Sequence, residues 1–240
     1  MGTVAPELPA SSGENFGSDL TGMGSFLIDP AGAARRVYTR WFWVAPLVLF
    51  SIVSLIASYV VMPMTRHVME VAPLPSGTTP ETYQKGIEMG LTIQRISMYF
   101  APLMAAIIFA IQTAILLGMS AVTGVNARFR QLFNLIAGCS LIQVLAAMAS
   151  VIVLKAKGEV SSFAELRPAL GLDIFLPAGT NKVLAAVLGY FSVFEIWWIV
   201  MMVLIYSIAF RVTKGKAVVV VAPLILLSII LRMVGAVFQR

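Results

Sequence analysis

The chain has 240 residues, of which 59% are hydrophobic and 12% are charged, and its mean hydropathy is +0.92. Soluble domains are about 45–50% apolar and about 25% charged, so this composition excludes a soluble globular protein. The net charge of +6 does not indicate a nucleic-acid partner, because the Lys and Arg residues flank the hydrophobic runs. Basic residues in such places anchor helices and contact anionic lipid headgroups. We therefore expect a membrane protein that binds membrane lipids and no nucleic acid.

The first 41 residues are expected to form a polar tail and one short helix. Residues 1–25 are rich in Gly, Ser and Pro, which is typical of a disordered segment, and we assign them as a cytoplasmic tail. In residues 26–41, Asp29 is a good N-cap and Pro30 a good first helical residue. This helix would carry apolar residues on one face and arginines on the other: Ala33, Val37 and Trp41, and Arg35, Arg36 and Arg40. The pattern predicts an amphipathic helix on the membrane surface, with a plain basic flank as the alternative.

Residues 42–238 contain five hydrophobic stretches that are long enough to span a membrane. A helix needs ~20 apolar residues to cross the ~30 Å hydrocarbon core. The stretches show no alternation of polar and apolar residues, so helices are expected rather than barrel strands. The fold class is therefore predicted to be all-α, a polytopic membrane bundle of five transmembrane helices. The predicted spans are 42–64, 98–121, 130–154, 189–211 and 217–238.

Two long connections carry signals for further helices. In 65–97, Thr78 and Glu81 have capping-box spacing, which predicts a helix that starts near residue 80 and runs into the second span. Pro102 is expected to kink that span.

In 155–188, Ser162 and Glu165 have the same spacing, which predicts a short helix that ends before Gly171. Another helix is expected to begin near Asn181 and to lead into the fourth span.

Basic residues set the expected orientation. With a cytoplasmic N-terminus, eight Lys and Arg residues lie inside and eight outside, so the counts are equal. The inner eight lie beside the first span or in short loops, where the positive-inside bias is strongest, which favours a cytoplasmic N-terminus and an external C-terminus. The inner eight are Arg35, Arg36, Arg40, Arg128, Arg130, Arg211, Lys214 and Lys216.

Two charged residues lie inside the predicted spans, Glu195 in the fourth and Arg232 in the fifth. Each is about six residues from the outer end of its span, or ~9 Å deep at 1.5 Å per residue. Since a short loop joins the two spans, we expect antiparallel neighbours and an intramembrane ion pair between Glu195 and Arg232. The alternative is that each side chain reaches the headgroups separately. Other embedded polar residues are expected to form interhelical hydrogen bonds: Gln112, Asn134 and Gln143.

Catalytic motifs are missing from the sequence. His67 is the single histidine and Cys139 the single cysteine, and no GxSxG, HExxH or P-loop pattern occurs. We therefore expect no enzymatic activity, no cofactor and no metal site. Cys139 is expected to be a small buried hydrophobic residue.

Three stretches resemble the motifs of one membrane protein family. IDPAGAARRVYTRWFWVAP carries Asp-Pro, a short helix and an aromatic, Pro-containing start of the first span. TGVNARFRQLF carries Gly, then Phe-Arg, then Phe four residues on. The last stretch, from FSVFEIWW to TKGKA, carries Phe-x-x-Trp followed by a basic turn and Ala. The matching positions are Asp29, Pro30, Trp43, Pro46, Gly124, Phe129, Arg130, Phe133, Phe194, Trp197, Lys214, Lys216 and Ala217.

Through these residues the chain resembles the Yip1 family of five-span membrane proteins over about residues 26–238. The Asp-Leu-Tyr-Gly-Pro motif of eukaryotic members is missing, so the chain resembles a prokaryotic member, which implies an inner membrane. The expected function is that of a scaffold or accessory protein that binds other membrane proteins or lipids, or associates with itself. The alternative is a small transporter or permease-like subunit with a site between the fourth and fifth spans near Glu195. A water-accessible cavity that reaches Glu195 would favour the transporter.

Overall fold

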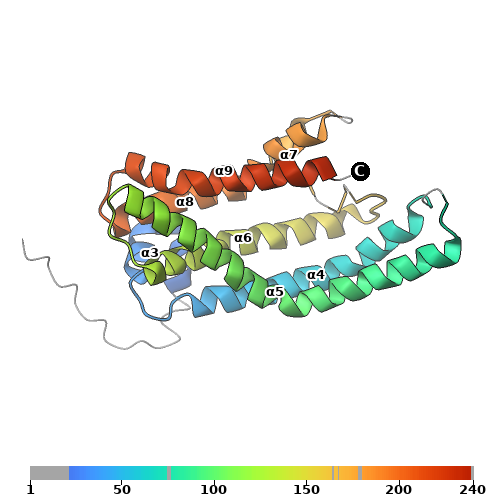
Figure 1. The fold of residues 1–240 in the computed structure, drawn as a ribbon, viewed down its shortest axis with the longest axis horizontal. Coiled ribbons are helices and arrows are strands. Elements are labelled where there is room, and N and C mark those ends of the chain that lie inside the picture. The colour runs from blue at the N-terminus through green and yellow to red at the C-terminus, as the bar shows by residue number, and fades with distance from the viewer. Residues whose placement is uncertain (1–21, 75–76, 164, 167, 178–179, 239–240) are drawn as a thin grey trace, which may run out of the picture.

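The computed structural model describes residues 22–74, 77–163, 165–166, 168–177 and 180–238. These residues form helices and no strand, apart from one isolated antiparallel bridge between Gly171 and Ser192. The long helices run side by side in Figure 1. In chain order the elements are α2 (Ser25–Ile28), α3 (Pro30–Arg36), α4 (Val44–Val71), α5 (Pro80–Val122), α6 (Phe129–Lys157), the 3₁₀-helix η1 (Leu172–Phe175), α7 (Lys182–Tyr190), α8 (Val193–Ala209) and α9 (Lys214–Phe238).

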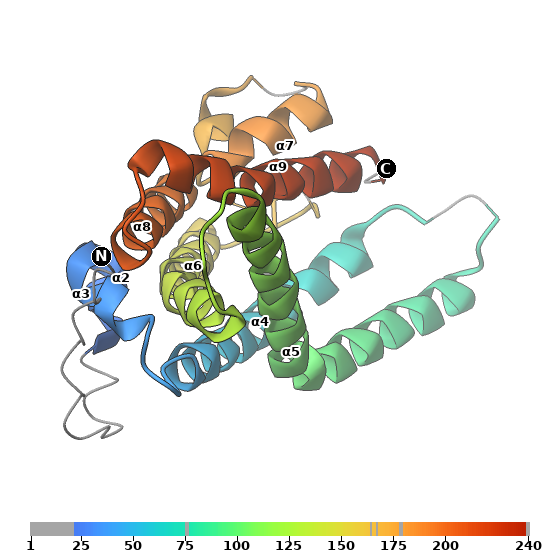
Figure 2. The ribbon, with the colours of Figure 1, turned by 60° about the vertical axis from the view of Figure 1, so that its left-hand side comes forward.

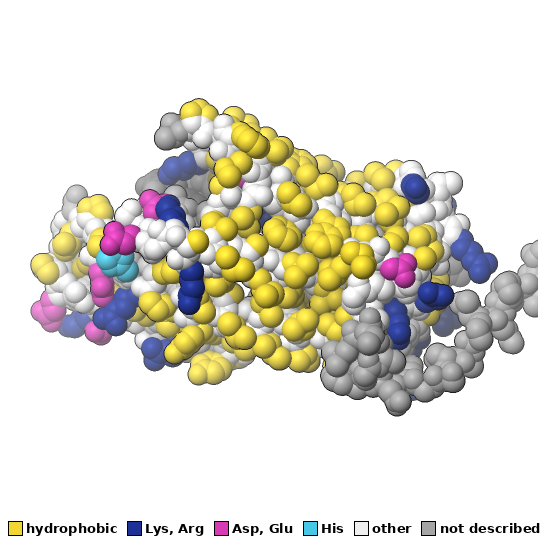
Figure 3. All heavy atoms as spheres, turned by 180° about the vertical axis from the view of Figure 1, so that it is seen from behind, with side chains coloured by type: hydrophobic (Ala, Val, Ile, Leu, Met, Phe, Trp, Pro, Cys, Tyr) yellow, Lys and Arg dark blue, Asp and Glu magenta, His cyan; other side chains and the backbone are white. Residues whose placement is uncertain are grey.

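Four helices, α4, α5, α6 and α9, are long and apolar enough to cross a membrane. They correspond to four of the five predicted spans, so the all-helical membrane fold is confirmed. The remaining one, the predicted fourth span 189–211, is not one helix. It contains the end of α7 and the 17-residue α8, because the backbone leaves the helical conformation at Phe191 and Ser192. The space-filling view shows a broad apolar surface between two ends that carry the charged side chains (Figure 3).

Helix α6 is the centre of the bundle. In its most apolar stretch 44% of the residues are buried, against 17–22% in the other three long helices. Small residues allow neighbouring segments to approach it closely, and Gly138 and the fully buried Cys139 lie side by side in the middle of its buried region. Helices α4, α5 and α8 and the short helices α2 and α3 all pack on α6.

Helix α5 has 43 residues, or about 65 Å at 1.5 Å per residue, twice the thickness of a hydrocarbon core. It bends along its length and contains Pro102, which breaks the helical hydrogen-bond ladder (Figure 2). The predicted start near residue 80 is confirmed, although Thr79 rather than Thr78 is the N-cap, because Pro80 occupies the first helical position. The α4–α5 hairpin extends past the end of α9 (Figure 1).

The two ends of the bundle are distinct. We call the end that holds residues 22–43, the 123–128 loop and the 210–213 turn the N-terminal end, and the opposite one the hairpin end (Figure 1). At the N-terminal end the Tyr38 hydroxyl donates a hydrogen bond to the Ala209 carbonyl, which fixes the segment before α4 to the end of α8.

The N-terminal segment differs from the predicted single helix over 26–41. Asp29 caps α3 and Pro30 begins it, as expected, but α2 and α3 are separate, and the chain is not helical from Val37 to Trp43. The apolar face of α3 packs on α8 and α6, so it is covered by protein. The predicted tail over 1–25 also ends too late, because Met23 is already buried, while residues 1–21 lie outside the described part.

The connection after α6 also differs from the prediction. The short helix expected from Ser162 and Glu165 is not formed in the described residues of this stretch. The carboxylate of Glu165 instead accepts hydrogen bonds from the amide and hydroxyl of Ser161, both at 3.2 Å, and pairs with Lys157 at 3.1 Å. The hydrogen bond from Lys157 lowers the pKa of Glu165, as does the Ser161 amide. The helix predicted from Asn181 is present as α7, with Asn181 as its N-cap.

A substitution at Gly138 tests the packing of α2 against α6. A Cβ atom there would lie 2.2 Å from Cε1 of Phe26, whose ring is fully buried and stacks on the Phe42 ring. We expect Gly138→Ala to lower the free energy of unfolding by about 1–3 kcal/mol, the usual cost of overpacking a core. The measurement is the thermal unfolding midpoint in detergent.

Gly118→Ala in α5 is the matched control, because a Cβ there meets no atom within 4 Å. This change should be neutral or stabilising by about 0.5–1 kcal/mol, since Ala favours helix over Gly. Equal losses in the two variants would contradict the packing of Phe26 on Gly138.

Candidate functional site at the contact of α6, α8 and α9

Glu195 lies in the first turn of α8. The hydroxyl of Ser192, the N-cap, accepts a hydrogen bond from the backbone N–H of Glu195 at 3.1 Å. The positive end of the helix dipole favours a carboxylate in this position. The sequence had placed Glu195 about six residues inside one continuous span. The structure corrects this, because the chain breaks at Phe191 and Glu195 is the third residue of α8.

The structure places Arg232 of α9 beside Glu195. Its Nη2 atom lies 3.0 Å from Oε1 of the carboxylate, and Nη1 lies 3.4 Å from the Gly189 carbonyl oxygen. The guanidinium carbon is 5.1 Å from the centre of the Tyr190 ring, within cation–π range. The Glu195 side chain is 14% exposed and that of Arg232 is 45% exposed, so Glu195 is partly buried and Arg232 lies at the bundle surface.

Gln143 of α6 completes the contact. Its Nε2 atom donates a hydrogen bond to Oε2 of Glu195 at 3.1 Å, which is an interhelical bond of the kind expected for this residue. Both carboxylate oxygens are therefore engaged, one by α6 and one by α9. This arrangement ties three helices together, and it leaves the carboxylate poorly placed to act as a free base.

The backbone of the long connection lies close to this ion pair. A Cβ atom on Gly171 would lie 2.7 Å from the carbonyl oxygen of Gly189, so only glycine fits there, and Asp173 accepts a hydrogen bond from the Gly171 amide at 3.1 Å. The sequence reasoning missed both glycines. It also missed the Ser192-x-x-Glu195 spacing, which is itself a helix-start signal and would have located the break before α8.

Asn134 forms a second polar centre near the N-terminal end. Its Nδ2 atom donates to the carbonyls of Val37 at 2.9 Å and Thr39 at 2.6 Å, and its Oδ1 atom accepts from the Trp43 amide at 3.1 Å. Asn134 is fully buried. One side chain thus satisfies three backbone groups of a non-helical segment. Gln112, for which a similar role was expected, makes no such bond to the rest of the described chain.

Several positions of the resemblance meet around Asn134. The Trp43 ring contacts the Phe133 ring edge-on at 5.5 Å, and Phe129 stacks on Phe133 at 5.9 Å. The Trp197 indole N–H donates to the Leu27 carbonyl at 2.8 Å, which joins α8 to α2.

The other positions of the resemblance shape the helix ends. The Asp29 carboxylate accepts from the amides of Ala31 and Gly32 and so caps α3. Gly124 follows α5 with φ +70°, the left-handed conformation that favours glycine after a helix. The remaining positions are a buried Pro46, an exposed Arg130, a half-buried Phe194, and, in the first turn of α9, Lys214, Lys216 and the fully buried Ala217.

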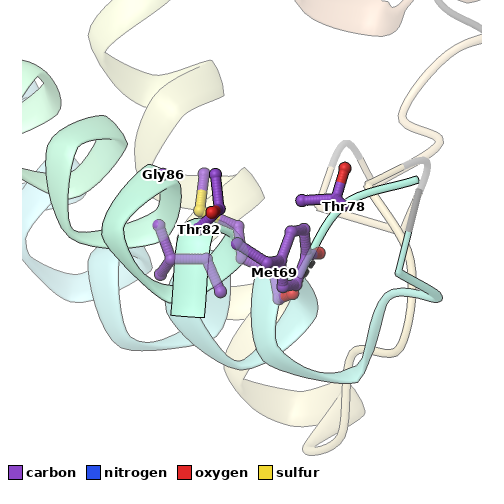
Figure 4. A pocket seen from close by; sticks show the side chains of 6 residues that line it. Met69, Thr78, Thr82 and Gly86 are labelled. Carbon is purple, nitrogen blue, oxygen red and sulfur yellow. Dashed lines mark hydrogen bonds between the residues drawn. The ribbon is translucent and has the colours of Figure 1, made fainter. Parts of the chain in front are cut away.

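A pocket lies between α4 and α5 near the hairpin turn, where Figure 4 shows the side chains around it. Its volume is about 340 Å³. Neither Glu195 nor Arg232 lines it. Its lining residues are Met69, Thr78, Thr82, Tyr83, Gly86 and Ile87.

Charge changes at Glu195 and Arg232 test their interaction. We expect Arg232→Gln to lower the free energy of unfolding in detergent by about 1–3 kcal/mol, because it leaves the mostly buried Glu195 carboxylate without its charged partner. Glu195→Gln should cost less, because the Arg232 side chain that it leaves is 45% exposed. The swap Glu195→Arg with Arg232→Glu should restore part of the loss relative to either single reversal.

The exposed pair Glu81–Lys85, 2.9 Å apart, is the control. The same neutralisations there should cost less than about 1 kcal/mol, since both side chains are in solvent. Strictly additive losses in the Glu195 and Arg232 series would show that the two side chains act independently.

Comparison with known proteins places the chain in a family. A search of curated proteins and a search of solved structures found no match. The family model of the Yip1 domain matches residues 23–235, which is most of the chain. The match includes the Asp29–Pro30 start of α3, the Asn134 centre and both partners of the Glu195–Arg232 pair. The chain therefore belongs to the Yip1 domain family.

Proposed function

We propose that the chain is a non-catalytic scaffold or accessory protein that binds other membrane proteins within the bilayer. The observation that carries this proposal is the outer surface of the long helices, where large apolar side chains are exposed. Tyr59 on α4 is 72% exposed, Tyr99 on α5 is 78% exposed and Leu231 on α9 is 61% exposed. Such faces suit lipid and the packing of further membrane helices.

The polar interior supports a structural role. The Glu195 carboxylate and the Asn134 amide have partners on all their polar atoms, and the Ser120 and Tyr206 hydroxyls bond to each other at 2.7 Å. A transporter needs polar groups that are free to bind a substrate in a water-accessible cavity. None of these groups lines the pocket of Figure 4, so this pocket does not provide the cavity at Glu195 that the transporter alternative requires.

The proposal includes five membrane crossings, with the N-terminal end in the cytoplasm. Helix α8 has 17 residues, the lower limit of about 17–25 for a spanning helix, and would cross at about 26 Å. If α8 crosses, the basic residues at the starts of α4, α6 and α9 all face the cytoplasm, in agreement with the positive-inside bias. The Yip1 resemblance in the sequence points to a prokaryotic inner membrane.

Cysteine labelling distinguishes five crossings from four. In a Cys139→Ala background, we expect a membrane-impermeant maleimide to label Ser161→Cys in intact cells and Asn126→Cys only after lysis. Both positions are exposed in loops at opposite ends of the bundle. Thr213→Cys, between α8 and α9, should behave like Asn126→Cys. Labelling of Thr213→Cys in intact cells would show that α8 does not cross.

Photocrosslinking tests the scaffold role directly. A benzoylphenylalanine at Tyr99 or Tyr59 replaces one exposed aromatic residue by another and should give discrete protein adducts in native membranes. Membranes that carry the same variants but are not irradiated are the control and should give none. An adduct of twice the 25.9 kDa chain mass would identify self-association. Crosslinks to lipid alone at both positions would contradict the scaffold role.

A further inference from the structure

Six basic side chains at the N-terminal end are exposed and have no acidic partner among the residues that the structure describes. None of them forms an ion pair within the described residues, whose ion pairs all lie elsewhere. The described acid at this end is Asp29, and its carboxylate already caps α3. Glu7, Glu14 and Asp19 lie outside the described residues. The six are Arg35, Arg40, Arg128, Arg130, Arg211 and Lys214.

The hairpin end has a different charge arrangement. Here basic side chains are paired with carboxylates: Arg66 with Glu70 at 2.8 Å, Lys85 with Glu81 at 2.9 Å, and Lys157 with Glu165 at 3.1 Å. Figure 3 shows Lys and Arg gathered at the N-terminal end and acidic and basic side chains mixed at the hairpin end. The sequence count of eight basic residues on each side hides this difference, because it ignores the acids.

Apolar side chains are exposed among the unpaired cations. Ile28 is 82% exposed, Val122 is 81%, Trp41 is 55% and Phe129 is 44%. The Arg40 guanidinium carbon lies 5.5 Å from the centre of the Trp41 ring. Aromatic and apolar groups beside Arg and Lys match the headgroup region of a bilayer, where the apolar part enters the lipid and the cation stays among the phosphates. An acidic soluble protein offers no such apolar layer.

We infer that the N-terminal end is a binding surface for the phosphate headgroups of anionic phospholipids. Each basic residue close to an anionic bilayer surface is attracted to it, and four or more together on one face form a strong electrostatic site. The surface consists of residues from α3, from the segment before α4, from the N-cap and first turn of α6, from the 210–213 turn and from the first turn of α9. This inference rests on the membrane location that the proposed function includes, and it does not require a protein partner.

The test measures the unfolding midpoint of the full chain in neutral detergent with added lipid. Phosphatidylglycerol should raise the midpoint more than phosphatidylcholine does, and about 1 M NaCl should reduce the difference, because the Debye length falls to about 3 Å. The variant Arg40→Gln, Arg128→Gln, Arg130→Gln, Lys214→Gln should lose about two thirds of the phosphatidylglycerol effect, since it removes four of the six exposed basic residues of this surface.

The matched control neutralises four basic residues at the hairpin end: Arg66→Gln, Lys85→Gln, Lys155→Gln, Lys157→Gln. It should keep the full phosphatidylglycerol effect. If the quadruple variant at the N-terminal end does not fold, the double variant Arg130→Gln, Lys214→Gln provides the same comparison, because neither side chain has a partner in the described structure.

Three results would overturn the inference. The first is an equal effect of the two lipids on the unaltered chain, and the second an equal loss in the control variant. The third is an equal rise with soluble glycerol phosphate, which would assign the surface to free phosphate rather than to lipid. Failure of the scaffold role appears separately: adducts at Tyr99 would be lost while the phosphatidylglycerol effect remained.

Discussion

The buried Asn134 amide is the interaction on which the fold depends. Backbone groups that leave a helix inside a protein must find new hydrogen-bond partners, and in a membrane water is not there to supply them. The non-helical segment 37–43 meets this requirement through Asn134, so α2 and α3 can fold back on α6. Nine residues further along α6, about 13.5 Å up the helix axis, the Gln143 amide binds Glu195 and so holds α8 and α9. One helix with two amides thus organises the N-terminal end and the middle of the bundle.

The long helices follow from the sequence because their signal is long and continuous. Hydrophobic runs, the Asp29–Pro30 cap and the Asn181 start all depend on nearby residues, and each is found in the structure. The failures have two different sources. Glu165 bonds to Lys157 instead of capping a helix, which is a contact that the local pattern does not contain. The break in the predicted fourth span does have a local signal, the Ser192-x-x-Glu195 helix start, which the continuous hydrophobic run masked.

At the candidate site, the charges of Glu195 and Arg232 and their equal depth in neighbouring spans were enough to predict that the two side chains interact. Two charges that are costly in lipid and lie in neighbouring helices have few alternatives to each other. Their surroundings were not predictable in the same way. Gly171 and Gly189 are brought together by the path of a long loop, which the sequence does not predict. A glycine has no polar or charged side chain from which such a contact could be inferred. An interhelical hydrogen bond was expected for Gln143, but its partner could not be predicted without knowing how α6 is aligned along α8.

The burial of Cys139 has a consequence for how opening of this protein can be followed. It is the single thiol of the chain, it is fully buried, and its neighbour Gly138 lies under the Phe26 ring. A thiol reagent reaches it only when the bundle opens around α6, so the modification rate reports the frequency of that local opening. The modification rate of Cys139 in the unaltered chain thus measures how often the N-terminal helices dissociate from α6, and no label has to be introduced.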